Sequence, residues 1–445
     1  MKKILILGAG MTASSLIKYM LDHAESNKWL VRLGDLSIEK AQKRINNHSH
    51  GEAFKFDSEN PGLLEKEVKS ADIVISLLPS NLHYLVSSSC VRNSKSLVTT
   101  SFLTPEIQKM DKEAREKEIL LLSEMGVEPG VDHMSAMQVI DRIKGNGDSL
   151  IAFESATGGL IAPEYDNNPW RYKFTWAPRN VVLAGQGGAR FYHNGKFKYI
   201  PYHKIFQRIE TIDIPGLGEF EVYPNHDSLK YQSAYGLTDL LTMFRGTIRR
   251  PGFCKAWDLL VQLGATDDSF VMDNSENMTY REFTDSFLAY DIIGTVESKL
   301  ANYLGIREDS ELMDKLRWLG LFEDIKIGIP ELTPARILQH ILEQKWRLRP
   351  GDKDMIIMQH QFDYNHLGTN RRIFSNMVVY GEDQNYTAMS ISVGLPVAII
   401  TKLILEGRID LTGVHIPVNK LIYEPVLSEL KDYGIQFHEK DIKLS

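Results

Sequence analysis

Short apolar runs alternate with amphipathic stretches through the first 125 residues of the chain. Runs that are apolar throughout are typical of strands covered on both faces, and apolar residues at helical spacing predict the helices between them. Strands are expected at 3–8, 30–35, 52–57, 72–79, 96–101 and 119–126, and helices at 14–24, 37–45, 61–71, 81–93 and 104–118. This strict alternation predicts an α/β fold with a parallel, doubly wound sheet.

The pattern changes near residue 150, where strand-like runs follow one another with turns between them. Strands at 150–159, 192–200 and 219–224 predict a mixed or antiparallel sheet. Helices are expected at 236–246, 252–264, 289–305 and 333–346, and strands return at 354–364 and 371–382. The last apolar stretch, 387–407, predicts a helix with a proline near one end.

Size and charge exclude several classes of protein. A chain of 445 residues is too long for one ordinary core, which predicts two or three domains. The net charge of −7 is spread along the chain without a basic block, so we expect no nucleic-acid partner. We also expect no membrane partner, because no apolar run reaches the roughly 20 residues of a span. The apolar start reaches glycine after a short run, which favours a strand over a signal peptide.

The cysteines and histidines show no spacing typical of metal ligands. Cys90 and Cys254 are the only cysteines and lie far apart, which predicts a reducing compartment and a cytoplasmic protein. The 13 histidines are scattered along the chain, so no metal site is expected.

A glycine-rich turn follows the first predicted strand. Gly8, Gly10 and Ala13 form a G-x-G-x-x-A pattern between that strand and the first helix. Gly8 permits the tight turn, Gly10 lets the backbone approach a pyrophosphate, and Ala13 keeps the helix close to the sheet. At the start of a regular βαβ unit, this pattern predicts a dinucleotide site, and the alternative is a glycine turn without a ligand.

Asp35 ends the second predicted strand, at the position where a carboxylate binds the ribose hydroxyls of NAD and repels a 2′-phosphate. NAD is therefore the first candidate cofactor and NADP the second. Arg32 lies within the strand, and Leu36 and Ser37 follow the carboxylate, so no phosphate clamp is evident. The alternative role for Asp35 is a cap on the next helix.

Three further segments follow strands of the predicted sheet: Asp57, Leu77–Pro79 and Thr99–Ser101. Ligands of an open α/β sheet gather at the carboxyl ends of its strands, so we expect these segments to lie at the dinucleotide site.

Several strings of the sequence are long and idiosyncratic: "VISLLPSNLH", "VTTSFLTPE", "EMGVEPGVDHM", "GGLIAPEYDNNPWRYKFTW", "YPNHDS", "RGTIR", "WLGLF", "KDMIIM" and "VGLPVAI". Through them the chain resembles the glutamate-forming saccharopine dehydrogenases, also called saccharopine reductases, over essentially its whole length. The resemblance implies an oxidoreductase that converts saccharopine to L-glutamate and 2-aminoadipate 6-semialdehyde in lysine metabolism, by hydride transfer to a nicotinamide cofactor and hydrolysis of the imine.

The resemblance also implies the architecture. It implies a Rossmann domain formed by 1–128 and completed by the C-terminal segment 385–445, and a helical domain at 236–351. It further implies a mixed α/β domain at 129–235 and 352–384, which binds substrate and carries the contact surface of a homodimer.

The functional residues of the family carry over to positions of this sequence. The implied cofactor contacts are Ala9, Gly10, Met11, Thr12, Asp35, Asp57, Leu78, Pro79, Thr100, Val127, Glu128, Pro129 and Ala177. The implied substrate contacts are Ser101, Phe102, Glu128, Asn225, His226 and Asp227.

The substrate half departs from the family. This chain has Phe102, Glu128, Thr157 and His226 where the family usually has Tyr, Asp, Cys and Arg. Phenylalanine lacks the hydroxyl, and histidine lacks the bidentate fork that grips a carboxylate.

Oxidation of a secondary amine requires a proton shuttle and cations for the substrate carboxylates. The catalytic candidates are Glu128, His226 and Asp227; His133 is a further shuttle candidate or else a capping or packing residue, and Asp132 is the expected helix N-cap. Cationic candidates are Lys173, Lys204, Arg245 and Arg249, with Arg245 expected beside glycine in a turn. The tryptophans are expected in the core or the dimer interface.

Two alternatives to saccharopine oxidation stay open. The first keeps the chemistry but changes the amine, for example to a carboxylated polyamine. The second is a dinucleotide-binding protein without catalytic activity.

Overall fold

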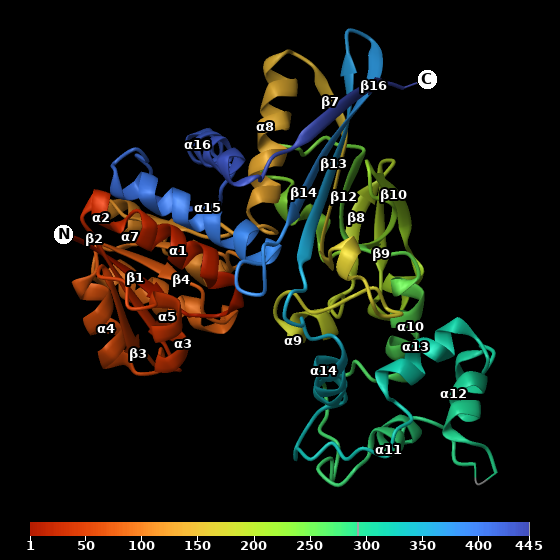
Figure 1. Ribbon diagram of the computed structural model, residues 1–445. Coiled ribbons are helices and arrows are strands. Elements are labelled where there is room, and N and C mark those ends of the chain that lie inside the picture. The colour runs from red at the N-terminus through yellow and green to blue at the C-terminus, as the bar shows by residue number, and fades with distance from the viewer. Residues whose placement is uncertain (292, 445) are drawn as a thin grey trace. The chain divides into compact units, whose positions relative to one another are not determined.

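The computed structural model describes residues 1–291 and 293–444, in which seven parallel strands form one sheet (Figure 1). Its strand order is β15-β6-β5-β4-β1-β2-β3. The strands are β1 (Lys2–Leu7), β2 (Trp29–Asp35), β3 (Gly51–Lys55), β4 (Ile73–Ser76), β5 (Ser96–Thr99), β6 (Leu120–Leu122) and β15 (Gly413–His415). This order confirms the predicted doubly wound sheet, and β15 confirms that the C-terminal segment completes it.

Helices lie within residues 1–150 and 385–445, and several of them cover this sheet. They are η1 (Met11–Ala13), α1 (Ser14–Asp22), α2 (Ala24–Asn27), α3 (Ile38–Ile45), α4 (Pro61–Ser70), η2 (Ser80–Leu82), α5 (His83–Arg92), α6 (Pro105–Gln108), α7 (Asp111–Glu116), α8 (Val131–Gly145), α15 (Ala388–Leu405), α16 (Lys420–Leu430) and η6 (Lys431–Tyr433). On one face, Leu5 and Val74 of the sheet share a buried cluster with Val68 of α4 and Val86 of α5. Burial of these side chains is the main force that holds the layers together.

Helix α15, drawn in blue in Figure 1, packs against α1. A Cβ added at Gly394 would lie 2.8 Å from the backbone nitrogen of Leu16, so the two helices touch through backbone. The Ser390 hydroxyl accepts a hydrogen bond from the backbone N–H of Ser15 at 3.0 Å. Pro396 lies in the middle of α15, whereas we expected it near one end.

By length and composition α15 could cross a membrane. Within the protein 78% of it is buried, as in the core helix of a globular fold, so these criteria give only weak evidence for a span.

A second sheet contains nine strands of the described residues and confirms the predicted mixed sheet. They are β7 (Ser149–Ile161), β8 (Ala189–His193), β9 (Lys196–Ile200), β10 (Glu210–Ile214), β11 (Gly218–Pro224), β12 (Thr242–Arg249), β13 (Asp354–His366), β14 (Thr369–Tyr380) and β16 (His438–Lys443). Strands β12 and β7 are parallel, and β12 pairs antiparallel with β11.

Two of the predicted helices are wrong in whole or part. The helix expected at 236–246 is instead a turn followed by β12, because a short apolar run fits a buried strand as well as a helix. Of the helix expected at 289–305, only α12 (Val296–Leu304) forms, and Ile292 lies outside the described residues.

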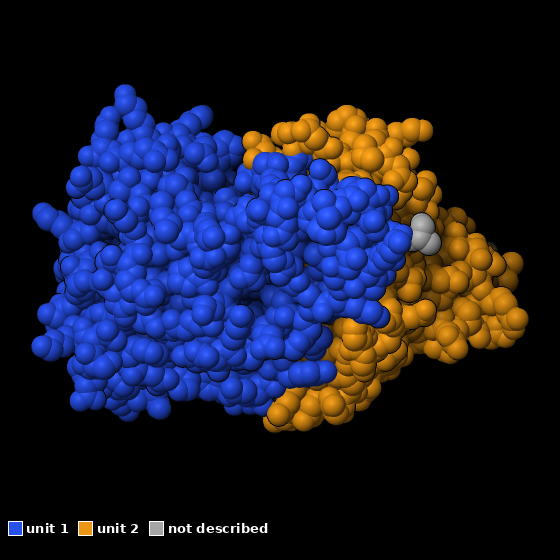
Figure 2. All heavy atoms as spheres, turned by 90° about the horizontal axis from the view of Figure 1, so that it is seen from above, with its two compact units in different colours: residues 1–150, 234–237, 362–445 blue, residues 151–233, 238–361 orange. Residues whose placement is uncertain are grey.

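The chain divides into two compact units, which Figure 2 colours separately. Unit 1 comprises 1–150, 234–237 and 362–445, and unit 2 comprises 151–233 and 238–361. Unit 2 also holds η3 (Pro163–Tyr165), α9 (Pro178–Val182), η4 (Tyr202–Gln207), η5 (Ser228–Tyr231), α10 (Phe253–Leu263), α11 (Tyr280–Asp285), α13 (Glu311–Leu319) and α14 (Pro334–Lys345). The three-domain boundaries expected from the sequence stay a prediction.

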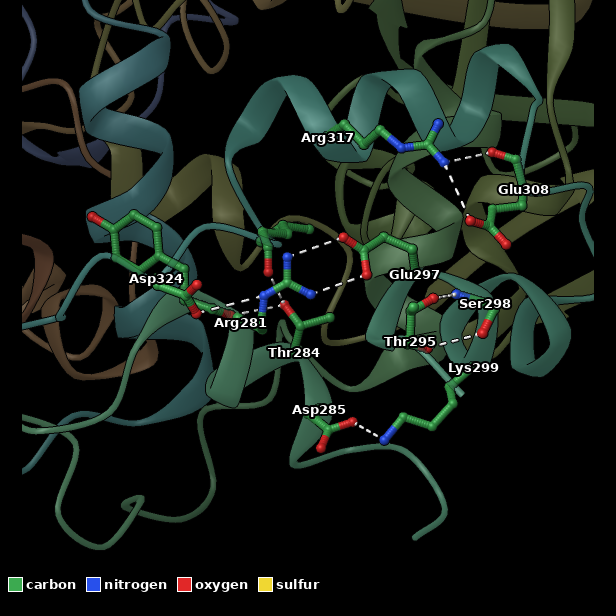
Figure 3. A network of polar contacts seen from close by, with 12 residues as sticks. Arg281, Thr284, Asp285, Thr295, Glu297, Ser298, Lys299, Glu308, Arg317 and Asp324 are labelled. Carbon is green, nitrogen blue, oxygen red and sulfur yellow. Dashed lines mark hydrogen bonds and ion pairs between the residues drawn. The ribbon is translucent and has the colours of Figure 1, made fainter. Parts of the chain in front are cut away.

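Ion pairs connect the small helices of unit 2 (Figure 3). Arg281 of α11 donates two hydrogen bonds of 3.0 Å to the carboxylate of Glu297 in α12, and lies 3.5 Å from Asp324. Lys299 of α12 pairs with Asp285 of α11. Because most of these groups are partly exposed, each pair contributes little on its own.

The centre of unit 2 is an aromatic cluster. Trp170, Trp257 and Trp346 are at most 1% exposed, and their rings pack against one another at 5.3 to 6.4 Å between centroids. These three tryptophans therefore lie in the core, which was one of the two places expected for them. Beside them Lys173, a predicted carboxylate contact, forms a buried ion pair of 2.7 Å with Asp352.

Replacing Lys173 by alanine would leave the buried Asp352 carboxylate without its cation. We expect Lys173→Ala to lower the free energy of unfolding by about 3–5 kcal/mol, measured by urea denaturation. The control is Arg307→Ala, which removes an ion pair with Asp309 at the surface and should leave the denaturation midpoint unchanged. Equal midpoints for the two variants would contradict this structural role.

Candidate functional site

The glycine turn after β1 lies against the end of β4. Gly8 has a φ of +104°, and a Cβ there would lie 2.9 Å from the carbonyl oxygen of Leu77. Only glycine fits this position. A Cβ at Gly10 would meet no atom within 4 Å, so the packing of the protein does not require glycine there. Close approach of a bound pyrophosphate does require it, so Gly10 fits a dinucleotide.

Asp35 is held at this turn by two backbone groups. Its Oδ2 accepts a hydrogen bond of 2.7 Å from the N–H of Ala9, and its Oδ1 accepts one of 2.9 Å from Ser37. The N-cap of α3 is Ser37, whose hydroxyl accepts from Lys40. Asp35 is therefore fixed beside the glycine turn, and the cap alternative does not describe it.

The other predicted cofactor contacts of unit 1 follow neighbouring parallel strands and so reach the same sheet edge. Met11 and Thr12 begin the 3-10 helix η1, and Leu78 and Pro79 follow β4. Thr100 follows β5, and the exposed Asp57 lies just beyond β3.

Val127, Glu128 and Pro129 form a tight turn after β6. The N–H of Gly126 donates to the carbonyl of Pro129 at 2.9 Å, and the Glu128–Pro129 peptide bond is cis. Gly130 closes the turn with a φ of +148°, where a Cβ would lie 2.0 Å from the oxygen of Gly126. The turn leaves Glu128 half-buried at the same edge of the sheet.

His83, at the start of α5, holds the loop that carries Ser101. Its Nε2 lies 2.6 Å from the Ser101 hydroxyl, and its Nδ1 lies 3.2 Å from the Thr99 hydroxyl. The imidazole is 1% exposed, and burial lowers the pKa of His83 to about 4. The ring is therefore neutral near pH 7.

A second buried histidine holds the same loop through Glu124. Glu124 accepts a hydrogen bond of 2.8 Å from the N–H of Leu103, and its other oxygen lies 2.8 Å from Nε2 of His133. Nδ1 of His133 contacts the hydroxyl of Tyr235. Glu124 and His133 are fully buried, so His133 has the packing role that was its alternative. The predicted N-cap role of Asp132 is wrong: Gly130 is the N-cap residue of α8, and Asp132 lies in the first turn, where its carboxylate accepts a hydrogen bond of 2.6 Å from the N–H of Gly130.

In unit 2, Asn225, His226 and Asp227 form the turn after β11. His226 has a φ of +49°, and partial burial together with the nearby Arg245 and Lys230 lowers its pKa. Asp227 caps η5 and pairs with Arg190 through hydrogen bonds of 2.7 and 3.1 Å.

Arg245 lies in the buried strand β12, so its predicted place in a turn is wrong. Its carbonyl accepts from the N–H of Asn225 at 2.9 Å, and its guanidinium lies 4.8 Å from the ring centroid of Tyr231. Arg245 therefore contacts the turn formed by Asn225 to Asp227 through its backbone carbonyl.

The remaining predicted contacts of unit 2 lie in other elements. Lys204 is exposed in η4 and donates to Gln207 at 3.0 Å, and Arg249 is buried beside Tyr172 and Phe253. Ala177 is the N-cap residue of α9.

We did not predict the roles of His83, Glu124 and Arg190 from the sequence. His83 ends the string "VISLLPSNLH" and Glu124 begins "EMGVEPGVDHM", so the strings themselves were the available signal. Among residues 1–291 and 293–444, no group of three or more His, Cys, Asp or Glu could hold a metal ion.

A parallel sheet with a glycine turn after β1, a carboxylate after β2 and an order that reverses beside β1 defines a dinucleotide-binding Rossmann protein. The family models called Saccharopine dehydrogenase NADP binding domain and Saccharopine dehydrogenase C-terminal domain match residues 4–122 and 126–435. The chain belongs to the saccharopine dehydrogenase family.

Relatives match over the full length. The Saccharopine dehydrogenase [NADP(+), L-glutamate-forming] of Pyricularia oryzae is 32% identical, over 99% of both chains. The rat mitochondrial alpha-aminoadipic semialdehyde synthase is also 32% identical, over 100% of this chain and 48% of its own.

Solved structures agree with these matches. The apo saccharopine dehydrogenase (L-Glu forming) of Saccharomyces cerevisiae superposes with a TM-score of 0.89 and 29% identity, covering 99% of this chain and 100% of its own. The NAD complex of a homospermidine synthase from Legionella pneumophila, with a TM-score of 0.59 and 10% identity over 99% of this chain and 91% of its own, shares the fold.

Substitutions of Gly8 and Gly10 distinguish a role in folding from a role in cofactor binding. We expect Gly10→Ala to keep the melting temperature and to weaken NAD binding about tenfold or more, because its methyl group would meet the cofactor and nothing else. Gly8→Ala should instead lower the free energy of unfolding by about 2 kcal/mol, because of its positive φ and its contact with Leu77. Calorimetric titration and thermal melts measure both; unchanged NAD affinity in Gly10→Ala would contradict the assignment of this turn.

His83 predicts a pH dependence of stability. Its pKa falls from 6.5 in the unfolded chain to about 4 in the fold, so the unfolded state binds the extra proton between these values. The stabilisation is complete above about pH 6.5 and is lost toward pH 4, by at most about 3 kcal/mol. His83→Gln, which does not titrate, should make the decline shallower in urea denaturation at each pH. Identical slopes for the two proteins would refute the prediction.

Proposed function

We propose that this protein oxidises saccharopine to L-glutamate and 2-aminoadipate 6-semialdehyde with a nicotinamide dinucleotide. The observation that carries the proposal is the shared sheet edge of unit 1. There Asp35 and the glycine turn lie at the same carboxyl edge of the sheet as the strand ends that precede Ser101 and Glu128. The full-length relatives named for this reaction support the substrate.

When bound, the nicotinamide ring supplies a hydride acceptor for the carbon next to the secondary amine nitrogen. Ser101 binds and orients the substrate, since its hydroxyl is fixed by His83 at 2.6 Å. The half-buried Glu128 carboxylate accepts a proton or binds the substrate amine.

His226 supplies a second proton-accepting group in unit 2. Burial and the nearby Arg245 and Lys230 lower its pKa, which favours the neutral imidazole that can accept a proton. Asp227 fixes this turn through Arg190, and Arg245 provides a cation beside it for a substrate carboxylate.

For the cofactor we propose a preference for NAD over NADP. Asp35 supports this preference, because a carboxylate at the end of β2 binds ribose hydroxyls and repels a 2′-phosphate. The names of the fungal relatives, which specify NADP(+), favour the other cofactor. The two cofactors therefore have to be compared directly.

A different amine is the second candidate substrate. Phe102, which is 46% exposed, and His226 stand where the family usually has a tyrosine and an arginine. Both changes remove a polar contact from the substrate half, which favours a substrate with fewer or differently placed carboxylates, such as a carboxylated polyamine.

We further propose a cytoplasmic homodimer. Both cysteines are buried and unpaired, which supports a reducing compartment. The exposed Phe197 and Tyr199 on strand β9 support a contact between copies.

The first test follows formation of the reduced nicotinamide by its absorbance, with saccharopine and either NAD or NADP. We expect turnover with kcat/KM about tenfold or more higher for NAD. Asp35→Ser should narrow or reverse this ratio, because the repulsion of the 2′-phosphate is lost.

The results of this test distinguish the proposed cofactor preference from the proposed substrate. Turnover with NADP ahead of NAD would reject the NAD preference and keep the reaction. No turnover of saccharopine with either cofactor, but turnover of a carboxylated polyamine, would reject saccharopine in favour of the second candidate.

A further inference from the structure

The hydroxyl of Ser101 ends a chain of hydrogen bonds that passes through two buried side chains. The backbone N–H of Ser101 donates to Oγ1 of Thr99 at 3.3 Å, and that oxygen lies 3.2 Å from Nδ1 of His83. The other ring nitrogen, Nε2, lies 2.6 Å from Oγ of Ser101. Thr99 and His83 are each 1% exposed, whereas Ser101 is half-buried. Ser101 is therefore the member of this chain that a ligand can reach.

The buried threonine sets the direction of the chain. A buried hydroxyl needs an acceptor for its proton, and within residues 1–291 and 293–444 the Thr99 hydroxyl has one, Nδ1 of His83. Its other neighbour, the N–H of Ser101, is itself a donor. Burial lowers the pKa of His83 to about 4, so the ring is neutral and carries a single N–H. Because Nδ1 accepts from Thr99, that N–H lies on Nε2.

The direction of the chain decides what Ser101 offers to a ligand. With the proton on Nε2, the imidazole donates to Oγ of Ser101. The proton of the Ser101 hydroxyl then has no acceptor in the part of the chain that the structure describes. A hydroxyl that accepts a hydrogen bond is also a stronger donor, because successive hydrogen bonds polarise one another.

We propose that His83 and Thr99 are positioning residues that hold Ser101 as a hydrogen-bond donor, so that Ser101 binds an oxygen of a substrate carboxylate and not the N–H of the amine. Carboxylates accept hydrogen bonds, whereas a protonated amine donates them. Donation to a carboxylate also leaves free the nitrogen lone pair that forms the C=N bond as hydride leaves. This inference rests on the proposed role of Ser101 as a substrate contact, and it holds for saccharopine and for a carboxylated polyamine alike.

The opposite tautomer of His83 is the competing explanation. Burial is the larger influence on the pKa of His83, and a hydrogen bond to the backbone of Leu78 opposes it. An N–H on Nδ1 directed at Leu78 would make Nε2 the acceptor, and Ser101 would then offer a ligand its lone pairs alone. It would also leave the buried proton of Thr99 without an acceptor, which is costly. The two tautomers therefore predict opposite ligand groups for Ser101.

The first measurement is the tautomer itself. Proton–nitrogen correlation NMR of the full chain with isotope-labelled histidine distinguishes a protonated ring nitrogen from an unprotonated one, and loss of signals in His83→Gln assigns them. We expect the proton on Nε2 of His83 at neutral pH. A proton on Nδ1 would overturn the proposal. Because this experiment needs no substrate, it decides the direction of the chain even if the protein oxidises no amine, a result that would reject the proposed function.

The second measurement is steady-state kinetics with the amine that the protein oxidises. Thr99→Val removes the hydroxyl that donates to His83, so we expect KM to rise about 10-fold and kcat to change about 2-fold at most. Thr99→Ser keeps the hydroxyl and should keep KM low. Ser101→Ala should raise KM as much as Thr99→Val, and the double variant should raise it no further, because Thr99 acts through Ser101.

The control is Thr401→Val, which removes another buried threonine hydroxyl, one that donates to the carbonyl of Val397 in α15 at 2.7 Å. It should leave KM and kcat unchanged. An unchanged KM in Thr99→Val, or an equal rise in Thr99→Ser or Thr401→Val, would overturn the proposal. Competitive inhibition by glutarate, a dicarboxylate without an N–H, should weaken in Ser101→Ala; undiminished inhibition would assign Ser101 to the amine. If Thr99→Val does not fold, the tautomer of the unaltered protein decides.

Discussion

The contact between the glycine turn and the end of β4 is the constraint on which the site depends. Gly8 lies so close to Leu77 that any side chain would strike its carbonyl. This contact joins the two halves of the parallel sheet where the strand order reverses, which is where an open α/β sheet binds its ligand. The backbone N–H of Ala9 is then directed to Asp35, and Gly8, Ala9 and Asp35 form the start of the site.

Hydrogen bonds between buried polar side chains hold the loop after β5 at the carboxyl edge of the parallel sheet. Two histidines that are at most 1% exposed hold the loop between Thr99 and Leu103, His83 directly and His133 through Glu124. Neither histidine needs to touch a ligand for this purpose. A buried network whose members all have partners is costly to break, so the loop that carries Ser101 and Phe102 is held in one conformation before substrate arrives.

The nucleotide half could be predicted from the sequence because its signals are local. Alternating apolar runs, the spacing of Gly8, Gly10 and Ala13, and Asp35 at a strand end each depend on residues close in the chain. The substrate half could not be predicted as well. β12 has an apolar run too short to distinguish strand from helix, and only its pairing with β7 and β11 decides.

The roles of His83, Glu124 and Arg190 could not be predicted for one common reason. Glu124 and Arg190 act through partners at a distance in sequence, namely Leu103 and Asp227. His83 reaches Thr99 and Ser101 only because α5 packs against β5. A sequence shows that such residues are present, but only tertiary packing shows what they contact.

The most direct test of this account is a crystal structure of the protein with NAD. The account predicts the pyrophosphate at Gly8 to Thr12, the ribose hydroxyls on Asp35, and the nicotinamide ring toward Ser101 and Glu128. A dinucleotide bound away from the carboxyl edge of β1 and β2, or no bound dinucleotide at saturating NAD, would contradict it.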